Sequence, residues 1–231
     1  MAWASENSEL FLGGKAVPDA WTQVRRYCGF EWDGNPPETW AFRYYDDIPS
    51  DRDEVSPLDV VCAGALHPGI SKEDMAFFWD HRQRLTEWLS DLPPTDPPSL
   101  SDLATADDKV ISVLRELPAL VEGTSLSLAS KVLHRKRPWL IPIVDKEVID
   151  RYRPLTGKRR ANEAWPPLLG CLAEDLRANV EYLAELGVVL AMERGTPIRG
   201  LSRLRIADIA IWMDAHHRLS TSDFPTQGSP K

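Results

Sequence analysis

The chain has 231 residues, a formal net charge of −8 at pH 7, and a hydrophobic fraction of 43%, with nine tryptophans. This composition excludes a disordered protein and predicts one large or two small globular domains with a sizeable core. The sequence has no apolar run of transmembrane length and no basic segment followed by an apolar one at its start. We therefore expect a cytoplasmic protein that does not engage a membrane.

The cysteine and glycine patterns indicate neither a metal nor an organic cofactor. Cys28, Cys62 and Cys171 are isolated, odd in number, and not part of a CxxC pair. They predict neither a disulfide framework nor a zinc site. The sequence also lacks a Gly-rich nucleotide loop and an internal repeat.

Residues 1–98 are interpreted as an N-terminal helical and aromatic region. Residues 19–27 predict a short helix, and residues 40–45 (WAFRYY) predict a short strand or an aromatic loop. Tyr44 and Tyr45 are candidates for a base pocket, because an extruded base is held by stacking on aromatic rings. The alternative is that both rings are buried in the core with their hydroxyl groups satisfied.

Two helix starts follow in the same region. Ser56-Pro57 is typical of an N-cap with proline at the first helical position, and it predicts a helix as far as Leu66. Ser71 with Asp74 resembles a capping box and predicts a longer helix. The stiff segment 92–98 (LPPTDPP) is the best candidate for a domain boundary. A surface loop inside one domain that extends to residue 219 is the alternative.

Residues 105–137 predict two helices joined by a short turn at Gly123. Thr105 is an N-cap for the first helix, which Pro118 should end, and apolar spacing predicts the second helix over residues 125–137. Such a turn leaves the first amides of the second helix without intrahelical partners. Together with the helix dipole, these amides make the corner a natural site for a phosphate group.

An extended segment, WLIPIV, follows Pro138, and Asp145 stands where the next helix begins. A structural N-cap is the ordinary interpretation of such an aspartate. Residues 131–160 are a basic segment in an acidic chain, with ten Lys and Arg against three Asp and Glu. This segment predicts a basic patch that steers a polyanion to one place. Alternatively, residues 135–137 only stabilise a helix C-terminus.

The C-terminal third is predicted to be helical. Residues 157–160 (GKRR) predict a basic loop, and Pro166-Pro167 predicts the start of a long amphipathic helix. The last helix is predicted over residues 201–217. Asp208 is expected near its apolar face, where it would pair with an arginine or cap a neighbouring helix. Residues 99–219 are expected to form one helical region, and residues 220–231 a disordered tail.

Residues 121–145 resemble the core of the helix-hairpin-helix (HhH-GPD) DNA glycosylases. That core has a hairpin Leu-Pro-Gly-Val-Gly, a Lys or Gln two residues later, a Thr-Ala step, and an apolar segment ending in Val-Asp. Without a gap, the hairpin is matched by residues 121–125 (VEGTS), the Thr-Ala step by Leu128-Ala129, and the Val-Asp by Val144-Asp145. Ser125 replaces the second glycine, Glu122 the proline, and Ser127 stands where bifunctional members keep their Schiff-base lysine. The segments RYYDDIP, KVLHRKRPWLIPIVD and LRIADIAIWM also resemble an uncharacterised, mostly actinobacterial family of single-domain proteins.

The resemblance implies a mostly α-helical, compact fold with a helix-hairpin-helix core, and a DNA glycosylase that acts on a base flipped from double-stranded DNA. By this resemblance Asp145 is the catalytic carboxylate, and nucleic acid is bound by Gly123, Thr124, Ser125, Ser127 and Lys131. A monovalent cation at the hairpin is compatible with the resemblance, and no other cofactor is expected. Ser127 implies a monofunctional enzyme that leaves an abasic site, although Lys131, one helical turn later, leaves a lyase step open.

The expected substrate is a modified base, such as a hypermodified or glucosylated phage pyrimidine removed in antiphage defence. Repair of alkylated or oxidised bases is the competing substrate class. Two other classes of function stay open: a non-catalytic helix-hairpin-helix DNA-binding protein, and a protein that docks an acidic partner on its basic segment. A monomer is expected in each case.

Overall fold

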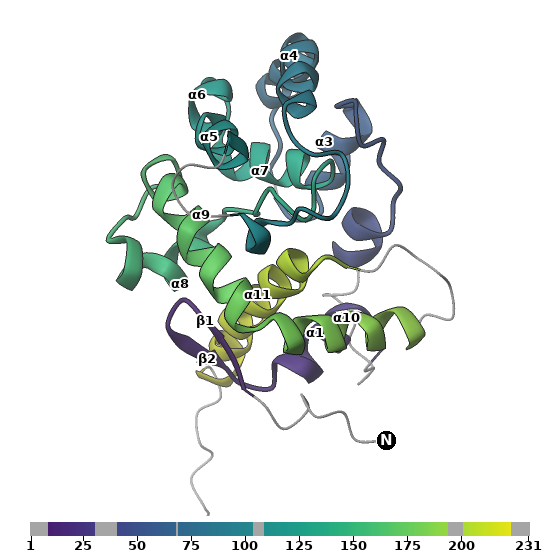
Figure 1. Cartoon of the computed structure of the whole chain (residues 1–231). Helices are drawn as coiled ribbons and strands as arrows, with labels where there is room; N and C mark the ends of the chain where they lie inside the picture. The colour runs from purple at the N-terminus through teal and green to yellow at the C-terminus, as the bar shows by residue number, and fades with distance from the viewer. Residues whose placement is uncertain (1–8, 31–40, 68, 104–108, 194–200, 223–231) are drawn as a thin grey trace, which may run out of the picture.

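The computed structural model describes residues 9–30, 41–67, 69–103, 109–193 and 201–222, with side chains as far as residue 216 in the last helix. The fold is mostly helical, as the sequence predicts (Figure 1). In the described residues, no helix has the length and apolar character needed to span a bilayer.

A short β-hairpin precedes the first helix. Strands β1 (Leu10–Leu12) and β2 (Lys15–Val17) pair antiparallel, with Leu10 opposite Val17. The turn residues Gly13 and Gly14 both have positive φ, a conformation that glycine adopts without steric cost. Sequence reasoning missed this hairpin, although the apolar residues on both sides of Gly-Gly were an available signal.

Helix α1 (Ala20–Tyr27) forms as predicted. The described part of segment 40–45 is not a strand or a loop, because residues 42–46 form the π-helix η2 (Phe42–Asp46). Phe42 and Tyr45 are each 2% exposed, so one helical turn buries both rings. Trp40 lies outside the described residues.

The two predicted capping residues start helices in the structure. Ser56 and Asp59 form a capping box ahead of α3 (Pro57–Ala63), and Ser71 and Asp74 form another ahead of α4 (Lys72–Ser90). Helix α3 ends three residues before the predicted Leu66. The connection after α4 leads to the short 3-10 helix η3 (Leu100–Asp102).

The central part of the chain has the predicted order of helix, turn and helix. It comprises α5 (Lys109–Arg115), α6 (Leu117–Leu120), α7 (Leu126–His134) and α8 (Lys146–Thr156). Pro118 does not end a helix, because it lies in the first turn of α6, where its missing N–H costs nothing. The predicted N-cap Thr105 lies outside the described residues. The glycosylase-type hairpin itself stays a prediction.

The last three helices are α9 (Ala161–Ala178), α10 (Val180–Glu193) and α11 (Arg203–Ser222). The predicted start at Pro166-Pro167 is wrong by five residues, and both prolines lie inside α9. The extra turn ahead of them is stabilised by Trp165, which is fully buried and donates its indole N–H to the carbonyl of Leu114 at 2.6 Å.

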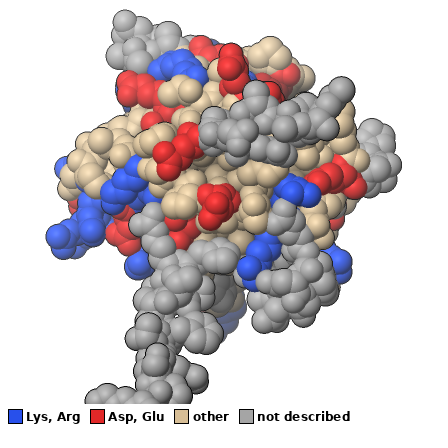
Figure 2. Space-filling model, turned by 90° about the horizontal axis from the view of Figure 1, so that it is seen from below, with Lys and Arg blue, Asp and Glu red and all other residues tan. Residues whose placement is uncertain are grey.

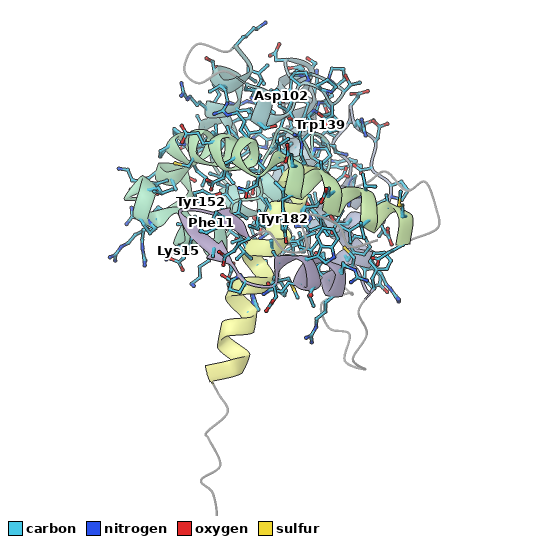
Figure 3. The ribbon with its side chains drawn as sticks, turned by 60° about the horizontal axis from the view of Figure 1, so that its bottom comes forward. Phe11, Lys15, Asp102, Trp139, Tyr152 and Tyr182 are labelled. Carbon is cyan, nitrogen blue, oxygen red and sulfur yellow. The ribbon has the colours of Figure 1, made fainter. Side chains whose placement is uncertain are left out.

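One hydrophobic core contains residues from both sides of the predicted boundary at residue 98, from the hairpin to α11. Figure 1 shows α3 to α7 in the upper half of the view, and the hairpin, α1, α10 and α11 in the lower half. Figure 3 shows Phe11 and Lys15 of the hairpin near Tyr152 of α8. The Tyr152 hydroxyl and the Gly13 amide both donate to Asp175 of α9, each at 2.6 Å, which fixes the hairpin to the helical body.

Candidate active site around Asp145

Asp145 is the N-cap of α8, as predicted. Its backbone is extended, and its Oδ1 accepts a hydrogen bond from the amide of Val148 at 3.1 Å. The segment before it is held against α7, because the amide of Val144 donates to Ser130 Oγ at 3.0 Å. The Asp145 side chain keeps 14% of its surface exposed, so a ligand can still reach its second oxygen.

Lys131 connects Asp145 to the start of α7. Its Nζ lies 3.8 Å from Asp145 Oδ2 and donates to Ser127 Oγ at 3.3 Å, and its side chain is only 4% exposed. The structure therefore brings together Asp145, Lys131 and Ser127, three of the residues implied by the resemblance. Ser127 stands at the position where the family has its lysine, but the ammonium group of Lys131 still lies beside Asp145.

The turn before α7 is shaped by Gly123 and held by Thr124. Gly123 has a φ of 114°, and a Cβ there would lie 3.3 Å from the ring of Phe77. Thr124 Oγ1 donates to Asp74 Oδ1 at 2.7 Å, which ties the turn to the start of α4.

Ser125 is the N-cap of α7, and its hydroxyl accepts from the amide of Leu128 at 3.0 Å. The hydroxyl groups of Thr124 and Ser125 thus form hydrogen bonds within the protein. Any phosphate at this corner would be bound through amides of the first helical turn.

The base pocket predicted from Tyr44 and Tyr45 requires a correction. Tyr45 is 2% exposed, and its hydroxyl donates to the carbonyl of Lys131 at 2.6 Å. Burial also raises the pKa of the Tyr45 hydroxyl well above its usual value. Tyr45 is therefore a core residue that positions α7 and cannot stack on a base that arrives from solvent. Tyr44 is 49% exposed.

The basic patch predicted over residues 131–160 does not include the side chains of residues 135–137, because all three are buried. Arg135 and Lys136 contact Asp59 of α3, and Lys136 Nζ also donates to Ser50 Oγ at 2.8 Å. Arg137 donates to backbone carbonyls of Arg52 and Leu89. These cations hold the loop after η2 against α3 and α4.

The exposed cations of the basic segment lie further along the chain, at Lys146, Arg153 and residues 158–160. Lys146 and Arg153 both pair with Asp150 on the surface of α8. On the face seen in Figure 2, acidic side chains separate the basic ones. The basic loop at residues 157–160 thus remains the exposed candidate for a backbone contact with DNA.

A second group of buried charges lies next to the Lys131–Asp145 pair. Arg205 of α11 binds Asp46 through two hydrogen bonds of 2.8 Å and also contacts Asp208, which confirms the predicted pairing of Asp208 with an arginine. Burial raises the pKa of Asp208 to about 7, and the negative charge of Asp145 adds to this shift.

His67, in the connection between α3 and α4, was missed by sequence reasoning. Its ring is half-buried, and its pKa is lowered by burial and by the positive charge of Lys131. His67 is therefore a neutral imidazole at pH 7, within electrostatic range of Lys131 and Asp145. No motif surrounds His67 in the sequence, so only the tertiary structure identifies it.

A cleft of about 1080 Å³ borders this second group of charges, because its lining includes Tyr45, Asp46 and Arg205, but it does not include Lys131 or Asp145. Its walls come from the loop after η2, the end of α7, helix α10 and the start of α11. Among them are Arg52, Trp139, Val188 and Arg203. The guanidinium of Arg52 covers the Trp139 ring, with Cζ 4.7 Å from the ring centroid. In the described residues, no three His, Cys, Asp or Glu side chains are grouped to hold a metal ion.

The fold and the site together define a mostly helical protein with a lysine–aspartate pair beside a helix-turn-helix corner. Residues 20–215 match the model of a family of unknown function (DUF6308), and the chain belongs to that family. No curated protein and no solved structure shows significant similarity to it.

Proposed function

We propose that this protein is a DNA glycosylase that hydrolyses the N-glycosidic bond of a modified or damaged base flipped out of double-stranded DNA. The observation that supports this proposal is the contact of Asp145 with Lys131, whose helix starts at the turn containing Gly123. The resemblance implies a carboxylate near the phosphate-binding turn. The 3.8 Å separation between Lys131 Nζ and Asp145 Oδ2 is consistent with that arrangement.

The chemistry assigned to Asp145 is stabilisation of a sugar cation. The bond between C1′ and the base nitrogen breaks, the base leaves with the electron pair and takes up a proton, and C1′ develops oxocarbenium character. Asp145 Oδ2, which lies beyond hydrogen-bond distance of Lys131, is available to stabilise this cation and to orient water. Water then adds to C1′ and loses a proton, leaving an abasic site.

Ser127 and Lys131 favour the monofunctional reaction. Ser127 cannot form a Schiff base, and the Lys131 ammonium is engaged by Ser127 and Asp145. The proposed product is therefore an intact abasic site without strand cleavage.

The proposed substrate is a hypermodified base, such as a glucosylated phage pyrimidine, removed in antiphage defence. This choice rests on the acidic and aromatic character of the first third of the chain, since carboxylates can accept hydrogen bonds from sugar hydroxyl groups. Asp74 and exposed Tyr44 belong to this region. Alkylated or oxidised bases are the competing substrates.

The test is release of base from duplexes that carry normal, alkylated, oxidised or glucosylated bases, followed by alkaline cleavage of the abasic sites. Asp145→Asn should lower the single-turnover rate at least about a hundredfold. Asp150→Asn is the matched control, because Asp150 lies on the same helix but is exposed and pairs only with surface cations. Equal rates for wild type and Asp145→Asn would refute the assignment of Asp145.

A second candidate is a non-catalytic DNA-binding or protein-interaction protein. Because residues 135–137 are buried, its contact surface would be the exposed cations at Lys146, Arg153 and residues 158–160. A DNA-binding protein would bind duplex with a steep salt dependence and release no base. A protein-interaction module would not bind duplex at moderate salt.

A further inference from the structure

Five charged side chains lie buried close to one another between α7, α8, α11 and η2. They are Lys131 and Arg205, which are cations, and Asp46, Asp145 and Asp208. Each of these side chains is at most 14% exposed. Asp46 and Asp208 share the single guanidinium of Arg205, whereas the nearby buried Arg135 is paired with Asp59. If Asp46 and Asp208 were both ionised, one of the two charges would have no cation of its own. Because burying an unbalanced charge is costly, one carboxyl group keeps its proton.

The hydrogen bonds indicate which carboxyl group holds this proton. Asp46 receives two hydrogen bonds from Arg205, and Asp145 is bonded by an amide and paired with Lys131. Asp208 contacts Arg205 through Oδ2 only, and in the described part of the chain its buried Oδ1 has no hydrogen-bond partner. Burial raises the pKa of Asp208 to about 7, and the cations Arg205 and Lys131 oppose this shift.

Four titratable groups close to Asp208 do not change charge near neutral pH: Tyr27, Tyr45, His134 and Arg205. Burial raises the pKa values of Tyr27 on α1 and Tyr45 on η2 well above their usual range. His134, at the end of α7, has a pKa lowered to about 3 by burial and by Arg205. Arg205 itself keeps its charge, because Asp46 and Tyr27 help to raise its pKa despite burial.

The two ion-paired groups are connected through Tyr45. The Arg205 guanidinium lies 4.9 Å from the Tyr45 ring centroid, and the Tyr45 hydroxyl bonds the carbonyl of Lys131 at 2.6 Å. Helix α11 also packs directly on α8, which carries Asp145 at its N-terminus. A charge on Asp208 therefore acts on Asp145 across protein interior, where screening by water is weak.

We propose that Asp208 is a positioning residue that acts through Asp145, holding a proton at low pH and placing a second negative charge behind Asp145 once it ionises. The proton goes to solvent, and the added charge strengthens the potential that stabilises the sugar cation. This inference rests on the proposed glycosylase function. A unit charge at roughly 10 Å and an effective dielectric constant of about 20 changes the rate about tenfold.

The experiment is a single-turnover pH profile of base release from pH 5.5 to 9 with enzyme in excess. The wild-type rate should rise about tenfold with a midpoint near 7, and Asp208→Asn should stay at the low-pH level. The control is Asp214→Asn, which alters a buried Arg–Asp pair between α8 and α11, where Arg151 Nη1 lies 2.8 Å from Asp214 Oδ2. The Asp214→Asn variant should keep the increase of the rate with pH. A rise that persists in Asp208→Asn, or is lost equally in Asp214→Asn, would overturn the proposal.

A second measurement keeps the inference testable if the variant is unstable. Carboxyl carbon NMR of the wild-type protein, with the Asp208 signal assigned by its loss in Asp208→Asn or by backbone connectivity, gives its titration midpoint directly. A midpoint near 7 supports the proposal, and one below 5 overturns it. If Asp208 titrates near 7 but no duplex yields an abasic site, the glycosylase function and the rate effect both fail, and the retained proton is still established.

Discussion

Replacement of Asp59 by Asn tests whether the basic stretch at residues 135–137 is structural. Asp59 is 1% exposed and receives hydrogen bonds on both carboxylate oxygens. Its cationic partners are Arg135, at 3.2 Å from Oδ1, and Lys136, whose ammonium contacts Oδ2. An asparagine keeps the shape but removes the charge, and its NH₂ group must face either the Arg135 or the Lys136 donor.

The expected loss in the free energy of unfolding is about 3 to 5 kcal/mol, the range found when one partner of a buried ion pair is removed. Two cations would remain buried, and Lys136 would keep only its bonds to Ser50 and the Asp51 carbonyl. Burial lowers the pKa of the Lys136 ammonium even with Asp59 present. The Asp59–Lys136 ion pair is therefore a weak net stabiliser of the fold. Removal of one partner is nevertheless strongly destabilising, because the other charge stays buried.

The pH dependence gives the same test a second readout. Burial alone would raise the pKa of Asp59, but hydrogen bonds from Lys136 and Ser50 outweigh it, so the pKa falls below 3.8. A carboxyl group with a lowered folded-state pKa contributes stability above its unfolded-state pKa and loses it as the pH falls through the folded value. The advantage of wild type over Asp59→Asn should thus be full above pH 5 and shrink below about 4.

Urea unfolding followed by circular dichroism measures both effects. The matched control is Asp53→Asn, because Asp53 also pairs with a cation of the stretch, Arg137, at 3.3 Å but is 79% exposed. It should cost less than about 1 kcal/mol. If Asp59→Asn were no more destabilising than Asp53→Asn, the buried network would not stabilise the fold as argued.

Two further predictions concern the turn and the buried carboxyl group. Gly123→Ala should lower stability by about 1 to 3 kcal/mol in urea unfolding, because a φ of 114° is strained for alanine and its Cβ would press on Phe77; an unchanged midpoint would refute the strain. The pKa of Asp208 is raised from 3.8 to about 7, so the folded state binds its proton more tightly and stability falls as the pH rises across that interval. Asp208→Asn should remove this fall, up to about 3 kcal/mol between pH 5 and 8, and equal pH dependence of wild type and variant would contradict it.

Features fixed by a few neighbouring residues could be predicted from the sequence. The capping boxes of α3 and α4 and the N-cap roles of Ser125 and Asp145 each depend on a side chain bonding an amide three residues away. The helix–turn–helix order around Gly123 follows from the same local chemistry. These local patterns predicted Lys131 on a helix and Asp145 at the start of the next helix, and the structure shows both.

Features that depend on distant parts of the chain could not be predicted. The charges at residues 135–137 look like a surface patch in sequence, because Asp59, the partner of Arg135 and Lys136, lies more than seventy residues earlier. The burial of Tyr45 has the same cause, since its hydroxyl acceptor is the carbonyl of Lys131. His67 approaches Asp145 only through the tertiary packing of the α3–α4 connection.

A comparison of Asp59 with Asp145 shows why the chemistry is assigned to the second carboxylate. Both cap helices, and both lie beside a lysine. Asp59 Oδ2 accepts from the amide and hydroxyl of Ser56 and from Lys136, and its Oδ1 accepts from Ser50 and Arg135, so its charge is fully compensated. Asp145 has one amide bond on Oδ1 and a lysine 3.8 Å from Oδ2, outside hydrogen-bond range. An oxygen that keeps unused hydrogen-bonding capacity and some exposure can interact with a cation or water from outside, and Asp145 therefore differs from a purely structural cap.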